Sequence, residues 1–500
     1  MTNPAYAQLL QLLERIHLLD SVNQLLGWDE QVNLPGGGAA LRADQSALLA
    51  DLHHQAASNP AIGEALKTLE ADRATLSADE QVVVREARRE YDRRVRLPAD
   101  LVGEIARHSS AAYHAWAKAR AKDDFESYAP FLEKHLELAR REAAALGWAD
   151  RPYDYAIDKH DPGFTAERIE ALFAELKEGL VPLVREIAAS PVKPPQDIFK
   201  GFPVDEQLAF LKEVTSRLGF DYEHGRIDVS LHPFCSGTGA DIRMTTRFNP
   251  DEPLDSLFSS IHETGHGLYS QGLPTAHHAT GLGQHAGMAM HESQSRMWEN
   301  QVARGPEFWA YFESKYRERF PAQLAGVSSE ELYLAINAVQ PTFIRVDADE
   351  VHYNLHIILR FELEKKLFSG ELAVRDLPAA WAESARELLG EAPPDNRRGV
   401  LQDIHWSGGA FGYFPSYCLG NMIAAQNWEA VRAALPNVEL DFARGEFGRL
   451  LGWLRTNIHE QGQRYPALEL VKRVTGKPLS PQPLLAYLRD RYGSLYLGKA

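Results

Sequence analysis

The stretch His262-Glu263-Thr264-Gly265-His266 has residue types and a spacing that fit metal chemistry, an H-E-x-x-H pattern. Residues four positions apart lie on the same face of an α-helix, so both imidazoles can reach one metal ion. Glu263 lies about 100° around the helix, where its carboxylate can meet a metal-bound water without ligating the metal. Zinc suits this donor set, because catalytic zinc keeps its fourth position open for water. The pattern therefore predicts metal-assisted hydrolysis.

Glu292 is the residue that we expect to supply a third metal ligand, since catalytic zinc usually has three ligands from the protein. It follows His266 by 26 residues, which leaves room for a loop around Pro274 and a second, antiparallel helix. His291 is a rival ligand, but its side chain would point about 100° away from that of Glu292. A helical Glu is ordinarily a surface carboxylate, so this prediction depends on the neighbouring H-E-x-x-H pattern.

The pattern falls within a predicted helix over 253–272, which Pro253 begins and Gly272 ends. Apolar residues at helical spacing predict that the first two hundred residues are also almost wholly helical. Between 220 and 250, short runs of β-branched and aromatic residues predict two or three strands of a small antiparallel sheet, and 340–350 could add another. We therefore expect a mainly α-helical protein with one small inserted sheet.

Composition excludes several other classes of protein. The 500 residues include 53 Lys and Arg against 69 Asp and Glu, a formal charge of −16, which weighs against binding to a phosphate backbone. Two cysteines, Cys235 and Cys418, cannot build a Cys-based zinc ribbon or an iron–sulfur site. The sequence has no run of about 18 apolar residues, and its first residues predict an amphipathic helix, not a signal peptide. We expect a cytoplasmic protein that binds neither nucleic acid nor membrane.

The motif HETGH, followed by HESQSR at 291–296, resembles the carboxypeptidase Taq family of zinc metallocarboxypeptidases. The resemblance extends in order over about 175 residues. One departure is Asp347, where the family more commonly has Glu. The other matching motifs are HPF at 232–234, DIRMT at 241–245, IRVDADE at 344–350 and GVLQDIHW at 399–406.

The resemblance implies a two-lobed helical body with a deep active-site groove, akin to neurolysin and angiotensin-converting enzyme. We expect one peptidase domain, with residues 1–200 as an N-terminal lobe or lid and 201–500 as the catalytic lobe, its sheet at about 220–250 and 340–350. The family also implies a homodimer that removes single residues from peptide C-termini with broad specificity. Cobalt can replace zinc in the family.

Residues after position 400 are candidates for stabilising the reaction's oxyanion. Zinc on His262, His266 and Glu292 would activate water, and Glu263 would act as the general base. The tetrahedral oxyanion needs further hydrogen-bond donors. The segment HWSGGAFGYFPSY offers His405, Tyr413 and Tyr417, and helical zinc peptidases of the neurolysin kind place a His and two tyrosines similarly.

A carboxypeptidase must also recognise a free carboxylate, for which the planar fork of Arg is suited. Arg345 is our first choice, since it lies in a family motif on a predicted strand. Arg243 is a second candidate, but it could instead pair with Asp241 or hold a loop at one end of the groove. His232 and Phe234 are expected to help form that closed end.

Two other functions remain open at this point. One is a helical zinc endo-oligopeptidase, with the same metal chemistry in an open-ended groove. The other is a non-catalytic helical binding protein whose H-E-x-x-H pattern is incidental or structural. The intact Glu263 argues against the second, because a structural zinc site needs no base.

Overall fold

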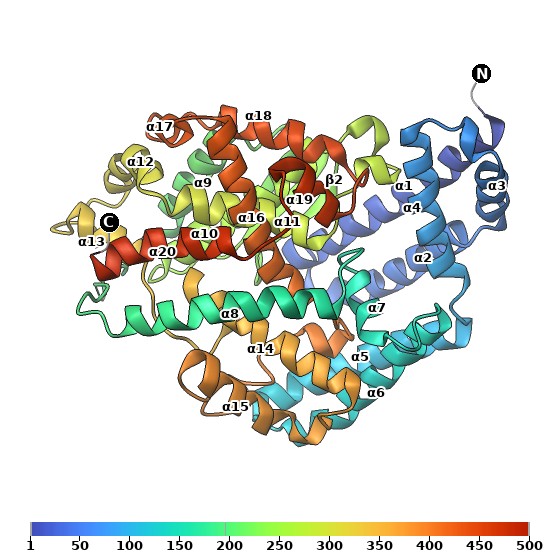
Figure 1. Ribbon diagram of the computed structural model, residues 1–500, viewed down its shortest axis with the longest axis horizontal. Helices are drawn as coiled ribbons and strands as arrows, with labels where there is room; N and C mark the ends of the chain where they lie inside the picture. Colours follow the sequence, from blue (N-terminus) through green and yellow to red (C-terminus); the bar gives the residue numbers. More distant parts are fainter. Residues whose placement is uncertain (1–2, 196, 499–500) are drawn as a thin grey trace.

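The computed structural model describes residues 3–195 and 197–498, and its regular structure is almost entirely helical (Figure 1). The helical expectation for the first two hundred residues is confirmed. The helices begin where local chemistry favours it: for example, the side chain and backbone of Ser77 form a reciprocal capping box with Glu80. The helices before the sheet are α1 (Pro4–Val32), α2 (Ala39–Ala57), α3 (Pro60–Ala71), α4 (Ala78–Val95), α5 (Ala99–Lys122), α6 (Phe125–Ala145), α7 (Pro152–Asp158), α8 (Ala166–Ala188) and α9 (Val204–Leu218).

Helices α1, α3 and α4 share a small hydrophobic core of their own, apart from the main core of the molecule. Leu9, Leu66 and Val83 are buried in it, together with Leu282 from the second half of the chain. In Figure 1 these helices lie toward one end of the long axis, beside the N-terminus. The main core begins at Ala119 in α5 and extends to Tyr496 near the C-terminus.

The small sheet has three strands, in the order β1-β3-β2. Its size is as predicted, but its pairing is mixed: β3 is antiparallel to β2 and parallel to β1. Gly237 in β2 has a φ of 106°, and a Cβ there would lie 1.9 Å from the Asp241 carbonyl oxygen, so only glycine fits. The strands are β1 (Gly225–Val229), β2 (Phe234–Thr238) and β3 (Asp241–Thr246).

Two helices that follow the sheet carry the H-E-x-x-H pattern and the expected third ligand. They are α10 (Pro253–Gly272), as predicted, and α11 (Met288–Arg296). A Cβ on Gly265 would lie 2.5 Å from the Cα of Ser295, so this glycine lets the two helices touch through their backbones. Helix α11 continues into a π-helix over Met297–Ala303, an uncommon geometry that often marks functional sites.

Residues 340–350 form no strand, contrary to the sequence prediction. They contain a short 3-10 helix, Arg345–Asp347, because the Ile344 carbonyl accepts from the Asp347 amide and closes a tight turn. Asp349 then caps the next helix by accepting from the amides of Val351 and His352. The segment therefore forms a turn that leads into the next helix instead of a strand.

The remaining helices complete the main core around α14 (Glu350–Ser369), which is buried on nearly all sides. A helix surrounded by protein must satisfy its own polar side chains there. These helices are α12 (Pro306–Arg319), α13 (Ser329–Ile336), α14 (Glu350–Ser369), α15 (Leu377–Leu389), α16 (Phe414–Ala434), α17 (Val438–Phe442), α18 (Gly448–Asn457), α19 (Ala467–Thr475) and α20 (Gln482–Leu497).

Glu364 in α14 gives a prediction for the pH dependence of stability. Its carboxyl accepts from the Tyr153 hydroxyl, the Trp406 indole and the Gly412 amide, and burial raises its pKa to about 7. Because the pKa of this carboxyl is higher in the folded protein than in the unfolded chain, its contribution to the free energy of unfolding is fully present when the pH is below the pKa of the unfolded chain. That contribution is lost as the pH rises toward 7. The loss amounts to about 3 kcal/mol. Glu364→Gln, which mimics the neutral acid, is expected to flatten denaturant-measured stability between pH 5 and 7; an unchanged slope would contradict this.

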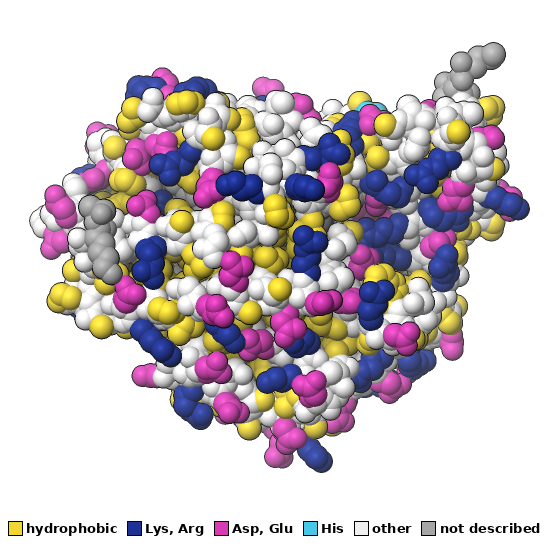
Figure 2. Space-filling view, in the orientation of Figure 1, with side chains coloured by type: hydrophobic (Ala, Val, Ile, Leu, Met, Phe, Trp, Pro, Cys, Tyr) yellow, Lys and Arg dark blue, Asp and Glu magenta, His cyan; other side chains and the backbone are white. Residues whose placement is uncertain are grey.

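Acidic and basic side chains are interspersed over the face shown in Figure 2. Within the part of the chain that the structure describes, no helix is both long and apolar enough to cross a membrane.

Candidate active site

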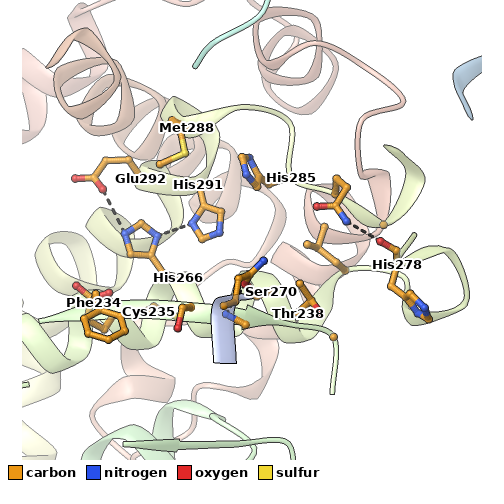
Figure 3. A pocket seen from close by; sticks show the side chains of 18 of the residues that line it. Phe234, Cys235, Thr238, His266, Ser270, His278, His285, Met288, His291 and Glu292 are labelled. Carbon is orange, nitrogen blue, oxygen red and sulfur yellow. Dashed lines mark hydrogen bonds and ion pairs between the residues drawn. The ribbon is translucent and has the colours of Figure 1, made fainter. Parts of the chain in front are cut away.

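The side chains of His262, His266 and Glu292 converge at the contact between α10 and α11. Glu292 Oε2 lies 3.5 Å from His262 Nε2 and 3.4 Å from His266 Nε2. The three ligand atoms lie within 4.8 Å of one another. Figure 3 shows His266 between Glu292 and His291, with an interaction drawn to each. The predicted metal ligands are therefore brought together.

The two spacings between Glu292 and the histidines fit a small tetrahedral metal ion. Bonds of about 2.1 Å at tetrahedral angles place neighbouring ligand atoms about 3.4 Å apart, close to the spacings between Glu292 and the two histidines. Two imidazoles and one carboxylate are also a donor set that catalytic zinc sites use. Among the described residues, no other group of three His, Cys, Asp or Glu side chains meets in this way.

Arg296 holds the Glu292 carboxylate in place. Its Nε donates to Glu292 Oε1 over 2.8 Å, which leaves Oε2 facing the histidines. Burial alone would raise the pKa of Glu292, but the neighbouring His262 and Arg296 outweigh it and hold the pKa well below its ordinary value. Gly420 of α16 permits this arrangement, since a Cβ there would lie 2.5 Å from Glu292 Cγ. The Glu292 carboxylate is therefore ionised, and its Oε2 faces the two histidines.

Sequence reasoning missed the residues that orient the two histidines. His262 Nδ1 lies 2.9 Å from Glu299 Oε2, and His266 Nδ1 lies 2.5 Å from His291 Nδ1. These contacts leave both Nε2 atoms free to face Glu292. Burial would raise the pKa of Glu299, but Arg296 and the hydrogen bond from His262 lower it to about 2. Glu299 lies in the π-helix, whose extra residue per turn the sequence pattern does not signal.

Replacing Glu299 by Gln is expected to weaken metal binding by about 10- to 100-fold, the usual effect of losing a partner of a metal-ligating His. The cause is loss of the negative charge that accepts from His262 Nδ1. Competition with a chromophoric chelator would measure the dissociation constant. Glu391→Gln, at an exposed position, is the matched control. Equal metal affinity of the Glu299 variant and wild type would show that this contact does not orient His262.

A cavity of about 550 Å³ opens onto the three side chains, and Glu263 lines it. Burial raises the pKa of Glu263, while the neighbouring His262 and His266 lower it in part. Cys235 on β2 lines the same cavity (Figure 3), and burial raises its pKa well above the ordinary thiol value. The described residues that line the cavity include no Lys or Arg.

Of the expected oxyanion donors, Tyr413 and Tyr417 lie at the N-terminal end of α16, and His405 lies in the short 3-10 helix His405–Gly408 before it. Tyr413 and Tyr417 line the cavity. The Nε2 atom of His405, which does not line it, lies 3.1 Å from the Tyr417 hydroxyl. Burial lowers the pKa of His405 to about 4 and raises that of Tyr413 to about 12. At neutral pH, His405 is therefore uncharged and Tyr413 keeps its proton.

Arg345 is buried behind the tyrosines and does not line the cavity. It pairs with Asp403 over 2.9 Å, and its Nη1 donates to the Tyr353 hydroxyl over 3.1 Å. Arg360 pairs with the other oxygen of Asp403 over 2.6 Å. Two guanidinium groups thus share one carboxylate, and these three side chains keep one net positive charge beneath the ring of Tyr417.

The other predicted binding residues are dispersed around the sheet. Phe234 lines the cavity from β2, whereas His232 is exposed in the turn before that strand. Arg243 is paired with Asp241, its Nε lying 2.9 Å from Oδ1, and its guanidinium covers the ring of Trp28. This is the structural alternative that the sequence left open for Arg243.

Comparison with known proteins decides the family. The model of the carboxypeptidase Taq (M32) metallopeptidase family matches residues 8–492. The chain belongs to this family. It is 44% identical to Thermostable carboxypeptidase 1 of Thermus thermophilus, over 98% of this chain and 99% of that one. Carboxypeptidase 1 of Bacillus subtilis is 37% identical, over 97% of each chain.

Solved structures of the carboxypeptidase Taq family agree with this fold. The crystal structure of the M32 carboxypeptidase from Deinococcus radiodurans has a TM-score of 0.96 at 42% identity, over 99% of this chain and 100% of that one. The chain is therefore a metallocarboxypeptidase, and the family and fold predicted from the sequence are confirmed. Membership implies a divalent metal, for which His262, His266 and Glu292 are the candidate ligands. The likeness to neurolysin stays a prediction.

Proposed function

We propose that this chain is a zinc-dependent carboxypeptidase of broad specificity, which removes single residues from peptide C-termini with Glu263 as general base. The observation that carries the proposal is the meeting of His262, His266 and Glu292 on the cavity that Glu263 lines. The donor set and its spacing support zinc, and cobalt fits the same ligands.

Glu263 performs the proton transfers in this proposal. A bound zinc ion would polarise water and the scissile carbonyl, lowering the pKa of the water toward about 7. Glu263 takes a proton from the attacking water and delivers it to the departing amine. Its place on α10, one residue after a ligand, puts its carboxylate on the cavity without entering the ligand set.

Tyr413 and Tyr417 supply hydrogen bonds to the oxyanion that forms at the scissile carbonyl. Both hydroxyls stay protonated near neutral pH, since burial raises the pKa of each. Neutral His405 contacts the Tyr417 hydroxyl from behind and fixes its direction. Donors held in place before the reaction stabilise developing charge without reorganisation.

Arg345 attracts the free carboxylate of the substrate through the positive charge that it shares with Arg360 and Asp403 beneath the tyrosines. Low dielectric around buried groups strengthens this attraction. Phe234 lines the cavity from β2, and His232 lies in the turn before that strand. Arg243 and Asp241 hold the start of β3 beside the cavity.

The larger organisation is also part of the proposal. Residues 1–200 act as an N-terminal lobe or lid and residues 201–500 as the catalytic lobe. The separate small core of α1, α3 and α4 supports this only for the first part of the N-terminal lobe, since residues from Ala119 onward belong to the main core. The family supports a homodimer, and a cytoplasmic location is part of the same proposal.

The test uses one short peptide in two forms, with a free and an amidated C-terminus, followed by mass spectrometry with and without a chelator. Stepwise loss of single residues from the free form only, abolished by chelation and restored by zinc, is the expected result. Internal cleavage of both forms would replace the proposal with a helical zinc endo-oligopeptidase. Absence of cleavage with zinc present would favour a binding protein.

A further inference from the structure

Helix α1 exposes a row of apolar side chains that are not buried in the small hydrophobic core to which this helix contributes. Leu18, Val22 and Leu25 are 55%, 43% and 38% exposed, and they lie one helical turn apart on one face. Clustered apolar exposure of this kind often marks a binding surface.

These three side chains form one wall of a groove of about 430 Å³ between α1 and the turn that joins β2 to β3. The groove and the catalytic cavity share several lining residues, among them Gln24, Gly237 and His278. Figure 1 shows α1 reaching from the N-terminal end of the molecule toward the helices of the site. The apolar row is therefore continuous with the site where the peptide reacts.

Two contacts hold α1 against the sheet and give the groove a defined width. The Gly237 amide of the edge strand β2 donates to Gln24 Oε1 over 2.9 Å. The Arg243 guanidinium lies over the ring of Trp28, 4.1 Å from its centroid. Both contacts join α1 to strands more than 200 residues away, so the groove belongs to the folded structure.

We propose that this groove binds apolar side chains of the peptide substrate several residues before its C-terminus. The inference rests on the proposed function, because the carboxylate end of the peptide must lie toward Tyr417 and Arg345. The rest of the peptide substrate then leaves the cavity at its other end, where Gln24 and His278 line both the cavity and the groove. An extended peptide advances about 3.3 Å per residue, so hexapeptides project well beyond a dipeptide.

The test compares kcat/KM for three substrates: an N-benzoylated dipeptide, a hexapeptide with Leu at the third to fifth positions from its C-terminus, and the same hexapeptide with Asn there. We expect wild type to prefer the Leu hexapeptide over the Asn one by about tenfold, the usual discrimination of a partly apolar pocket. The double variant Leu18→Ser, Val22→Ser is expected to lower the ratio for the Leu hexapeptide over the dipeptide by about tenfold.

Leu41→Ser, Leu48→Ser is the matched control, since these side chains of α2 are 63% and 60% exposed and do not line the groove. Its ratios are expected to equal those of wild type. Equal ratios in both double variants would overturn the inference and leave the proposed function intact. Loss of oligomeric assembly in the groove variant, with its ratios unchanged, would assign the row to a subunit interface instead. If wild type cleaved no substrate, the proposed function would fail as well.

Discussion

Glu263→Gln is expected to lower kcat about 10³-fold while the protein keeps its metal. The amide occupies nearly the same volume as the carboxylate but cannot accept the proton of the attacking water, and general-base catalysis typically contributes 10² to 10⁴. Steady-state kinetics on a free C-terminal peptide would measure the loss. KM is expected to change little, because Glu263 acts on the reacting water and not on the peptide.

Metal content and unfolding midpoint of the Glu263 variant are the controls, and both should match wild type. Unchanged activity would remove Glu263 from the mechanism. Loss of the metal together with activity would show that the carboxylate supports the ligand set, and the general-base role would then lack evidence.

Glu292→Ala is expected to weaken metal binding by more than about 100-fold, beyond the effect of losing an outer partner such as Glu299. The variant removes one of three converging ligands and leaves Arg296 with less compensation for its buried charge. Removing one partner of a buried ion pair typically costs about 3 kcal/mol of stability. Elemental analysis after dialysis and denaturant unfolding would measure the two effects.

Glu292→Gln separates the two consequences, because it preserves shape while removing the charge. Its metal affinity is expected to lie between those of wild type and Glu292→Ala. Full metal content in Glu292→Ala would mean that another residue completes the site, and His291, the rival ligand in the sequence, would be the first to replace.

The metal ligands could be predicted from the sequence because helical geometry fixes the relation of His262 to His266. Four residues make about one turn, so the spacing alone aligns two imidazoles. Glu292 followed from the need for a third ligand and an antiparallel helix. That argument did not include Gly265 and Gly420. These glycines let α10 and α16 pack closely against α11, which brings Glu292 within reach of the two histidines.

Pairings across long distances in the chain could not be predicted. The strand expected at 340–350 is a turn because Arg345 pairs with Asp403 and its amide with Gln402, partners that no local pattern reveals. The parallel pairing of β1 with β3 was missed for the same reason, since alternation predicts a strand but not its neighbour. The position of Glu299 beside His262 depends on a π-helix, which no sequence pattern signals. The hydrogen bond between Gln24 and Gly237 joins residues 213 positions apart in the chain.

Anomalous diffraction at the zinc absorption edge, from crystals of the active protein, tests the central claim most directly. The account predicts one strong peak per chain, about 2.1 Å from His262 Nε2, His266 Nε2 and a carboxylate oxygen of Glu292. A peak at other residues, or the absence of any peak at these three in crystals that hydrolyse peptide, would contradict it.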